Sequence, residues 1–395
     1  MQKIPDSMRK KLIGTSTLNW HRAHPDIPLD IWSRVLRQRA SATALARKRI
    51  YLDQKYWNYC RDVIVGRPTK REHTQIWEML CDLSDGGKIV CPIGQPVFRE
   101  TLKLERGSRM VVARAIDRLC HGVAIQAPRE LAVIEISHWT WKHLLHDDTL
   151  PSASHFAFTP AAFVFGDPPI DLPFPGSDAL AMKKAILDFN ASFSLEDLMQ
   201  LADWPRLDDD DSAFQAQQTL DAKLHQSDFS SYKEVYALEL RGIADLFEAD
   251  LQEFVHDLWN RGMRVNVCGL PCSPEDMTRE VVAIIVAGML LGRVTTEIPT
   301  LHIRAAIHAA IRWRRQQKYV KGDRLDFQHA TVALGYCDAF LTDRRLENIL
   351  RLKPPDLARQ YHCEVISDDA RVLDYLHRLS DGREAATQPG NRDGE

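Results

Sequence analysis

The sequence predicts an α/β protein in which a parallel sheet flanked by helices is divided by a long, mostly helical insertion. Strand-like and helical segments alternate within residues 49–125 and again within 301–380. The intervening 126–300 carries helical patterns, entered through a proline-rich stretch. A helical extension over 1–48 and a polar tail over 381–395, expected to be disordered, complete the predicted organisation.

The first half of the sheet is predicted from two apolar runs separated by a helix. In chain order we expect a strand at 49–52, a helix at 70–85, a strand at 88–93 and helices at 96–104 and 110–119. Asp53 directly follows the first strand, and Glu100 lies on the helix that follows the second.

The second half repeats the alternation. In order, we expect a helix at 326–335, a strand at 339–342, a helix at 343–352, a strand at 363–366 and a helix at 368–379. Asp326 opens the first of these helices, and Asp343 follows the strand AFLT.

Bulk composition limits the classes of function. The 51 basic and 54 acidic residues almost cancel, so a nucleic-acid partner needs a local basic face. The cysteines lack paired spacing, and Cys268 and Cys272 are read as ordinary thiols rather than a zinc site. The apolar run Val281–Leu291 is shorter than the ~20 residues of a membrane span and is read as a buried helix with Ser273 as its N-cap. A cytoplasmic, soluble protein with no membrane partner is expected.

Carboxylates stand where an α/β sheet usually presents its chemistry, beyond the carboxyl ends of the strands. The four candidates are Asp53, Glu100, Asp326 and Asp343. Oxygen ligands of this kind suit Mg²⁺ or Mn²⁺, which activates water and offsets charge on a phosphodiester. Asp53 follows an apolar strand, so it is expected to be partly buried and to need a counter-charge such as a metal ion.

Three ordered segments resemble the signatures of PIN-domain nucleases, which include the toxin ribonucleases of bacterial toxin–antitoxin pairs. The segments are IYLDQKYW, CPIGQPVFRETLK and GDRLDFQHATVALGYCDAFLTDRRL, and the resemblance covers about half of the chain. It implies a parallel sheet with an acidic pocket at the strand ends and metal-dependent cleavage of RNA, or less often DNA. It also implies a toxin or defence effector with a protein regulator such as an antitoxin.

The resemblance carries the site over to four matching acids, which are Asp53, Glu100, Asp326 and Asp343. Many members place the last acid two residues after the threonine, where this chain has Arg344. The fourth ligand is therefore either Asp343, from the adjacent position, or Asp338. Asp323 is a second candidate at the Asp326 end.

Simpler roles exist for the same side chains. Asp326 and Asp343 are both suited to cap the helices that they open. Glu100 could pair with Lys103 at helical spacing on the surface. His329 is read as a packed or hydrogen-bonded histidine rather than a catalyst.

A basic run before Asp326 is the candidate nucleic-acid contact. Its residues are Arg312, Trp313, Arg314, Arg315, Lys318, Tyr319, Lys321 and Arg324. Cations would hold phosphates while the aromatic rings stack on bases. The alternative is a solvated basic helix with Trp313 in the core.

Two further functions stay open. One is a metal-independent HEPN-type ribonuclease, whose Arg-x4–6-His spacing fits Arg324–His329 and Arg114–His121. The other is a catalytically silent PIN-like module that binds nucleic acid or regulates a partner. The aspartates at 208–211 are read as a solvated loop, because a calcium loop needs alternating ligands. Nothing in the sequence supports kinase, dehydrogenase or serine-hydrolase chemistry.

Overall fold

The computed structural model describes residues 17–382, apart from 148, 173–175, 202–203, 208–210, 225–228, 266–268, 270–272 and 315–317. Several predictions lie outside the described residues. They concern the first 16 residues, the tail after Gly382, Cys268, Cys272, Asp208–Asp210 and Arg315.

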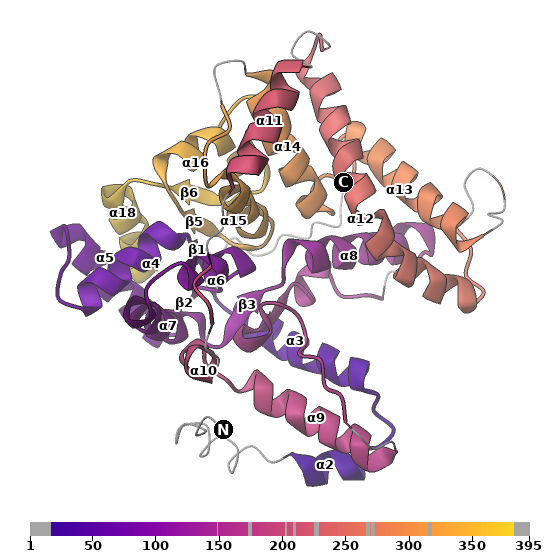
Figure 1. The fold of residues 1–395 in the computed structure, drawn as a ribbon, viewed down its shortest axis with the longest axis horizontal. Coiled ribbons are helices and arrows are strands. Elements are labelled where there is room, and N and C mark those ends of the chain that lie inside the picture. Colours follow the sequence, from indigo (N-terminus) through magenta and orange to yellow (C-terminus); the bar gives the residue numbers. More distant parts are fainter. Residues whose placement is uncertain are drawn as a thin grey trace.

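A four-stranded parallel sheet lies at the centre of the fold. Its strands are β1 (Lys48–Leu52), β2 (Ile89–Val90), β5 (Ala339–Leu341) and β6 (Glu364–Ile366), in the order β2-β1-β5-β6. In the middle of the sheet Leu52 pairs with Leu341, so the two distant parts of the chain meet there. The prediction of an α/β fold with a parallel sheet and flanking helices is therefore confirmed, and Figure 1 shows the helices on both sides.

The second predicted strand is shorter than its apolar run suggested. After β2 the chain leaves β1, and Ile93 instead forms a parallel bridge with Ala124. Ala124 belongs to β3 (Val123–Ile125), which pairs antiparallel with β4 (Phe158–Pro160). The bridge thus connects a small second sheet to the β2 side of the main one.

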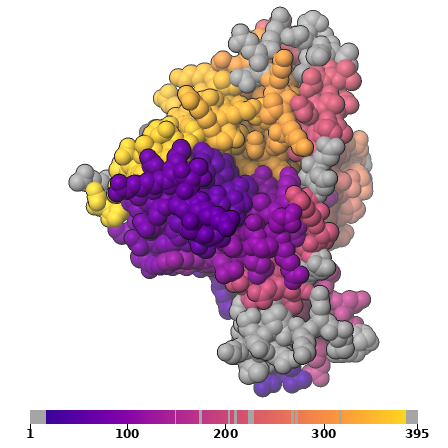
Figure 2. All heavy atoms as spheres, turned by 60° about the vertical axis from the view of Figure 1, so that its left-hand side comes forward, coloured from indigo at the N-terminus to yellow at the C-terminus, as the bar shows by residue number. Residues whose placement is uncertain are grey.

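Helices from both parts of the chain cover the main sheet. In the first part they are α4 (Gln54–Ile64), α5 (Arg71–Asp85), α6 (Gln95–Leu102) and α7 (Arg106–Cys120). In the second part they are α14 (Pro299–Trp313), α15 (Asp323–Tyr336), α16 (Arg344–Leu350), α17 (Leu357–Gln360) and α18 (Asp369–Ser380). Figure 2 shows the first part, in purple, lying directly against the second, in orange and yellow.

The N-terminal region and the insertion supply the remaining helices. They are α2 (Leu18–Ala23), α3 (Leu29–Leu45), α8 (Pro128–Trp139), α9 (Ser177–Ala191), α10 (Leu195–Leu201), α11 (Ser212–Leu224), α12 (Tyr232–Asn260) and α13 (Pro274–Leu290). Short π-helical and 3₁₀ turns lie at Thr140–Leu144, Ala153–His155 and Ala161–Phe163. In Figure 1, α2, α3 and α9 form a lobe below the sheet, whereas α11–α14 lie together on another side. Ser273 caps α13, as predicted.

One hydrophobic cluster joins the sheet, its helices and the insertion, with members from Ala40 to Leu379. A buried carboxylate also ties the insertion helix α8 to α14 and α15. Glu135 on α8 accepts hydrogen bonds from the backbone N–H of Thr300 (3.0 Å) and from the Thr300 hydroxyl (2.6 Å). The Tyr336 hydroxyl also donates to Glu135. Among the described helices, none has the length and apolar character needed to cross a membrane.

Candidate acidic site at the strand ends

Asp53 is fixed where β1 ends and α4 begins. Its backbone N–H donates to the Leu341 carbonyl (3.0 Å), and its carboxylate accepts from the backbone N–H of Lys55 (2.9 Å). Asp53 is therefore a helix cap, a role that the sequence reading did not assign to it. With 8% of its surface exposed, it is buried, as expected. Burial raises the pKa of Asp53 to about 6, although the neighbouring Thr342 and His329 side chains lower it in part.

Asp343 occupies the equivalent place after β5. It caps α16, as expected, and accepts a hydrogen bond from the backbone N–H of Leu346 (2.8 Å). Because β1 and β5 are adjacent and parallel, Asp343 and Asp53 lie at the same edge of the sheet. The charge of Asp343 contributes to the raised pKa values of both Asp53 and Asp326.

Asp326 approaches the same edge from the first turn of α15. The suggestion that it caps this helix is wrong, because α15 begins at Asp323, directly after Gly322. Burial, with the charges of Asp343 and Glu100, raises the pKa of Asp326 to about 7, although nearby His329 lowers it in part.

Glu100, on α6, reaches the group through a histidine. Its Oε2 atom lies 2.8 Å from Nε2 of His329, and Nδ1 of His329 lies 2.9 Å from the Tyr51 hydroxyl. Burial alone would lower the pKa of His329, but Glu100, together with Asp53 and Asp326, raises it above its usual value. His329 is therefore packed and hydrogen-bonded, as its simpler reading held, but it is also part of the acidic group.

All four acids that the sequence singled out are thus brought together from β1, α6, α15 and β5. The charges of Glu100 and Asp343 both contribute to the raised pKa values of Asp53 and Asp326. Hard oxygen donors of this kind suit Mg²⁺ or Mn²⁺. Among the described residues, however, no three His, Cys, Asp or Glu side chains converge closely enough to hold an ion in their present rotamers. The donor chemistry fits a divalent cation, and at least some of the acids would have to move closer together to bind one.

The alternative fourth ligand, Asp338, is contradicted by its position. It precedes β5, and its backbone N–H donates to the Arg49 carbonyl (2.8 Å), so it lies at the opposite edge of the sheet. Its carboxylate forms a two-pronged pair with the Arg49 guanidinium (2.9 and 3.0 Å). Burial opposes ionisation, but Arg49 holds the pKa of Asp338 below its usual value.

Asp323, the other alternate, is held by other partners. Its buried carboxylate pairs with Arg345 of α16 and accepts from the backbone N–H of Val320 (2.7 Å). Burial raises the pKa of Asp323, and Arg345 offsets part of that rise. Asp323 therefore joins the start of α15 to α16, and the acids Asp326 and Asp343 stand at the starts of these two helices.

The structure corrects two members of the predicted nucleic-acid contact. Tyr319 is 3% exposed and hydrogen-bonds to His308 (3.1 Å), so it cannot stack on a base. Arg312 pairs with Glu239 of α12, and both side chains are mostly buried. Trp313 is 37% exposed, so the alternative that placed it in the core is also wrong.

Other cations of this run lie at the surface. Lys318 and Lys321 are exposed, and exposed Arg314 donates to the Lys353 carbonyl (2.7 Å). Arg324, five residues before His329 on α15, pairs with the buried carboxylate of Asp211 (2.8 Å).

The other HEPN-type pair is also engaged elsewhere. Arg114 of α7 faces Glu196 (3.4 Å), and His121 hydrogen-bonds to Ser84 (2.9 Å) at the end of that helix. These contacts give both side chains a structural role.

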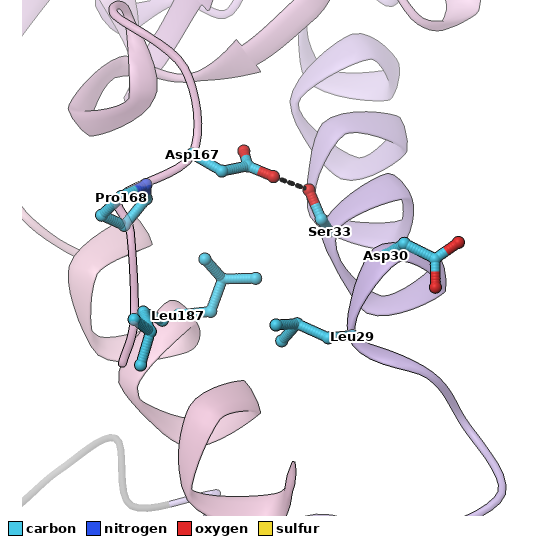
Figure 3. A pocket seen from close by; sticks show the side chains of 7 residues that line it. Leu29, Asp30, Ser33, Asp167, Pro168 and Leu187 are labelled. Carbon is cyan, nitrogen blue, oxygen red and sulfur yellow. Dashed lines mark hydrogen bonds between the residues drawn. The ribbon is translucent and has the colours of Figure 1, made fainter. Parts of the chain in front are cut away.

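A pocket of about 400 Å³ lies in the lobe formed by α3, α9 and the loop at 167–170. Figure 3 shows Leu29 and Leu187 facing each other across it, while Ser33 hydrogen-bonds to Asp167 at one side. None of the four acids lines this pocket.

Comparison of the chain with family models, with curated proteins and with solved structures gave no match. The acidic group is therefore the feature of the molecule that points to a function.

Proposed function

We propose that this protein is a nuclease that depends on a divalent cation and hydrolyses phosphodiester bonds of RNA or, less often, DNA. The proposed ligands of Mg²⁺ or Mn²⁺ are Asp53, Glu100, Asp326 and Asp343. One observation carries the proposal: acids from segments almost 300 residues apart meet at the carboxyl edge of a parallel sheet, and two of them have raised pKa values.

Electrostatics support a cation at this edge. Buried carboxylates are costly unless paired, and His329 is the cationic side chain that acts on both Asp53 and Asp326. Three acids, Glu100, Asp53 and Asp326, act on this one imidazole, so it offsets their negative charge only in part. A divalent ion would offset that charge and, when bound, would activate water and stabilise charge on a phosphoryl group.

The resemblance to PIN-domain nucleases supports the same assignment and extends it. The order of the acid-bearing segments agrees with that family, and the observed parallel sheet is compatible with it. A role as a toxin or defence effector, with an antitoxin or another protein as regulator, follows from this resemblance and forms part of the proposal. Exposed Arg314, Lys318 and Lys321 are the cations of the basic run proposed to contact substrate phosphates.

The test compares two aspartates that share a local role. Asp53 caps α4 after β1, and Asp368 caps α18 after β6. We expect Asp53→Asn to abolish cleavage of labelled RNA and DNA in Mg²⁺ or Mn²⁺, whereas Asp368→Asn keeps it. EDTA should stop cleavage by the unsubstituted protein. Cleavage that survives EDTA, or a folded Asp53→Asn variant as active as its parent, would contradict the proposal.

A catalytically silent module that binds nucleic acid or a partner is the second candidate. It is favoured by the lack of three converging ligands among the described residues. Binding of labelled single-stranded RNA without cleavage, in the presence of Mn²⁺ and at equal strength in Asp53→Asn, would favour this candidate.

A further inference from the structure

A chain of hydrogen bonds forms one wall of the acidic group. It runs from the Tyr51 hydroxyl to Nδ1 of His329 (2.9 Å), and from Nε2 of His329 to Oε2 of Glu100 (2.8 Å). Tyr51 lies on β1 and is fully buried, and His329 lies on α15 and is almost fully buried. Tyr51 and His329 thus connect β1, an inner strand of the sheet, to Glu100 on α6.

The direction of the hydrogen bonds follows from the groups that meet. A carboxylate oxygen can only accept, so Nε2 of His329 donates its hydrogen to Glu100. At Nδ1 a charged ring donates to the Tyr51 oxygen, and a neutral ring accepts from the Tyr51 hydroxyl. In both states the ring is held between the Tyr51 hydroxyl and Glu100.

Space for this arrangement comes from Gly94. A Cβ atom added at this residue would lie 2.8 Å from the Tyr51 hydroxyl oxygen and 3.3 Å from the Val332 side chain. The φ angle of Gly94 is −116°, which any residue can adopt, so the requirement is for room rather than for backbone freedom. The Tyr51 hydroxyl is therefore seated in a place that a larger residue at 94 would fill.

We infer that Tyr51 and His329 are positioning residues that orient Glu100 as a cation ligand, an inference that rests on the proposed function. The Glu100 side chain is partly exposed and intrinsically flexible. Its hydrogen bond to His329 uses Oε2, so Oε1 is the oxygen that we expect to bind a cation. Hydrogen bonds behind a metal ligand fix its orientation, and their loss typically weakens metal binding by about 10–100-fold.

The experiment measures Mn²⁺ affinity by calorimetry for the full chain and for two matched variants. Tyr51→Phe removes the first hydrogen bond and keeps the ring. Tyr56→Phe is the control, because Tyr56 is also buried and its hydroxyl has no hydrogen-bond partner among the described residues. We expect the Mn²⁺ dissociation constant to rise about tenfold in Tyr51→Phe and to stay unchanged in Tyr56→Phe.

A second measurement needs neither metal nor activity. In the metal-free protein labelled with ¹⁵N-histidine, the His329 signals, assigned with His329→Gln, should show hydrogen on Nε2 and a hydrogen-bonded Nδ1. Tyr51→Phe and Gly94→Ala should both change the Nδ1 signal. An Nε2 atom without hydrogen in the unsubstituted protein would overturn the inference even if the variants failed to fold.

The outcomes separate this inference from the proposed function. If the unsubstituted protein binds Mn²⁺ and Tyr51→Phe binds it equally well, the positioning role is refuted and the proposed cation site stands. If the unsubstituted protein binds no Mn²⁺, both are refuted. A weaker affinity in Tyr51→Phe alone, with hydrogen on Nε2 of His329, supports the positioning role.

Discussion

Replacing Asp53 by asparagine is expected to stabilise the metal-free protein at alkaline pH. The Asp53 carboxylate is buried beside other acids, and its pKa is about 6 instead of 3.8. Asparagine caps a helix about as well as aspartate does, so the hydrogen bond to the Lys55 N–H can be kept. The substitution therefore removes a buried charge while preserving the local structure.

The magnitude follows from proton linkage. Because the pKa is higher in the folded state, the stabilising effect of proton binding at Asp53 is fully present below pH 3.8 and is lost as pH rises through about 6. A rise of about two pKa units corresponds to roughly 3 kcal/mol. Asparagine does not titrate, so the variant should gain up to about 3 kcal/mol over its parent between pH 4 and pH 8. For a chain of 395 residues this is a shift in Tm of about 4 °C.

The assay is thermal unfolding at pH 4, 6 and 8, in EDTA and in Mn²⁺, for the parent, Asp53→Asn and Asp368→Asn. In EDTA the Tm difference between Asp53→Asn and the parent should grow in favour of the variant as pH rises. Mn²⁺ should raise the Tm of the parent and of Asp368→Asn, because a ligand that binds the folded state stabilises it, but not that of Asp53→Asn. A Tm difference independent of pH would refute the assigned electrostatics.

Three other predictions concern separate parts of the molecule. The affinity for Mn²⁺ should rise at least about tenfold from pH 6 to pH 8, measured by calorimetry, because the pKa values of Asp53 and Asp326, about 6 and 7, require proton release before binding; a flat profile would contradict this. Asp338→Asn should lower the free energy of unfolding by roughly 1–3 kcal/mol by breaking the pair with Arg49, without changing Mn²⁺ affinity. Weaker Mn²⁺ binding in this variant would indicate that Asp338 is a cation ligand after all. Burial raises the pKa of Glu135 to about 8, so stability is lost as pH rises from 4.5 towards 8. Over that range the free energy of unfolding of Glu135→Gln should therefore rise relative to that of its parent, by on the order of 4 kcal/mol in denaturant unfolding. An equal pH dependence of the two free energies would contradict this prediction.

The strand-end acids could be found from the sequence because their signal is local. Asp53 and Asp343 each follow an apolar run of strand length, and parallel strands bring such positions to one edge. Asp338 was misjudged because it stands only five residues before Asp343, on the other side of a three-residue strand. Only the pairing with Arg49 shows which edge it occupies.

Long-range partners explain the other errors. Tyr319 and Arg312 look available in a basic run, but His308 and Glu239 on packed helices engage them. The sequence does not show that His329 belongs to the acidic group, because its partner Glu100 is 229 positions away. One signal could have pointed to it, because His329 follows Asp326 at helical spacing and so shares its helix face.

Glu135 has a consequence for how the chain comes apart. Its carboxylate accepts hydrogen bonds from Thr300 at the start of α14 and from Tyr336 at the end of α15. α15 also carries Asp326 and His329, so the insertion helix α8 is attached to the element that supports the acidic group. Melting of α8 would leave a buried carboxylate, a threonine and a tyrosine without partners at once. We therefore expect α8 to unfold together with α14 and α15, and a chain trimmed to 49–125 and 301–380 would lack the carboxylate that accepts from the Tyr336 hydroxyl.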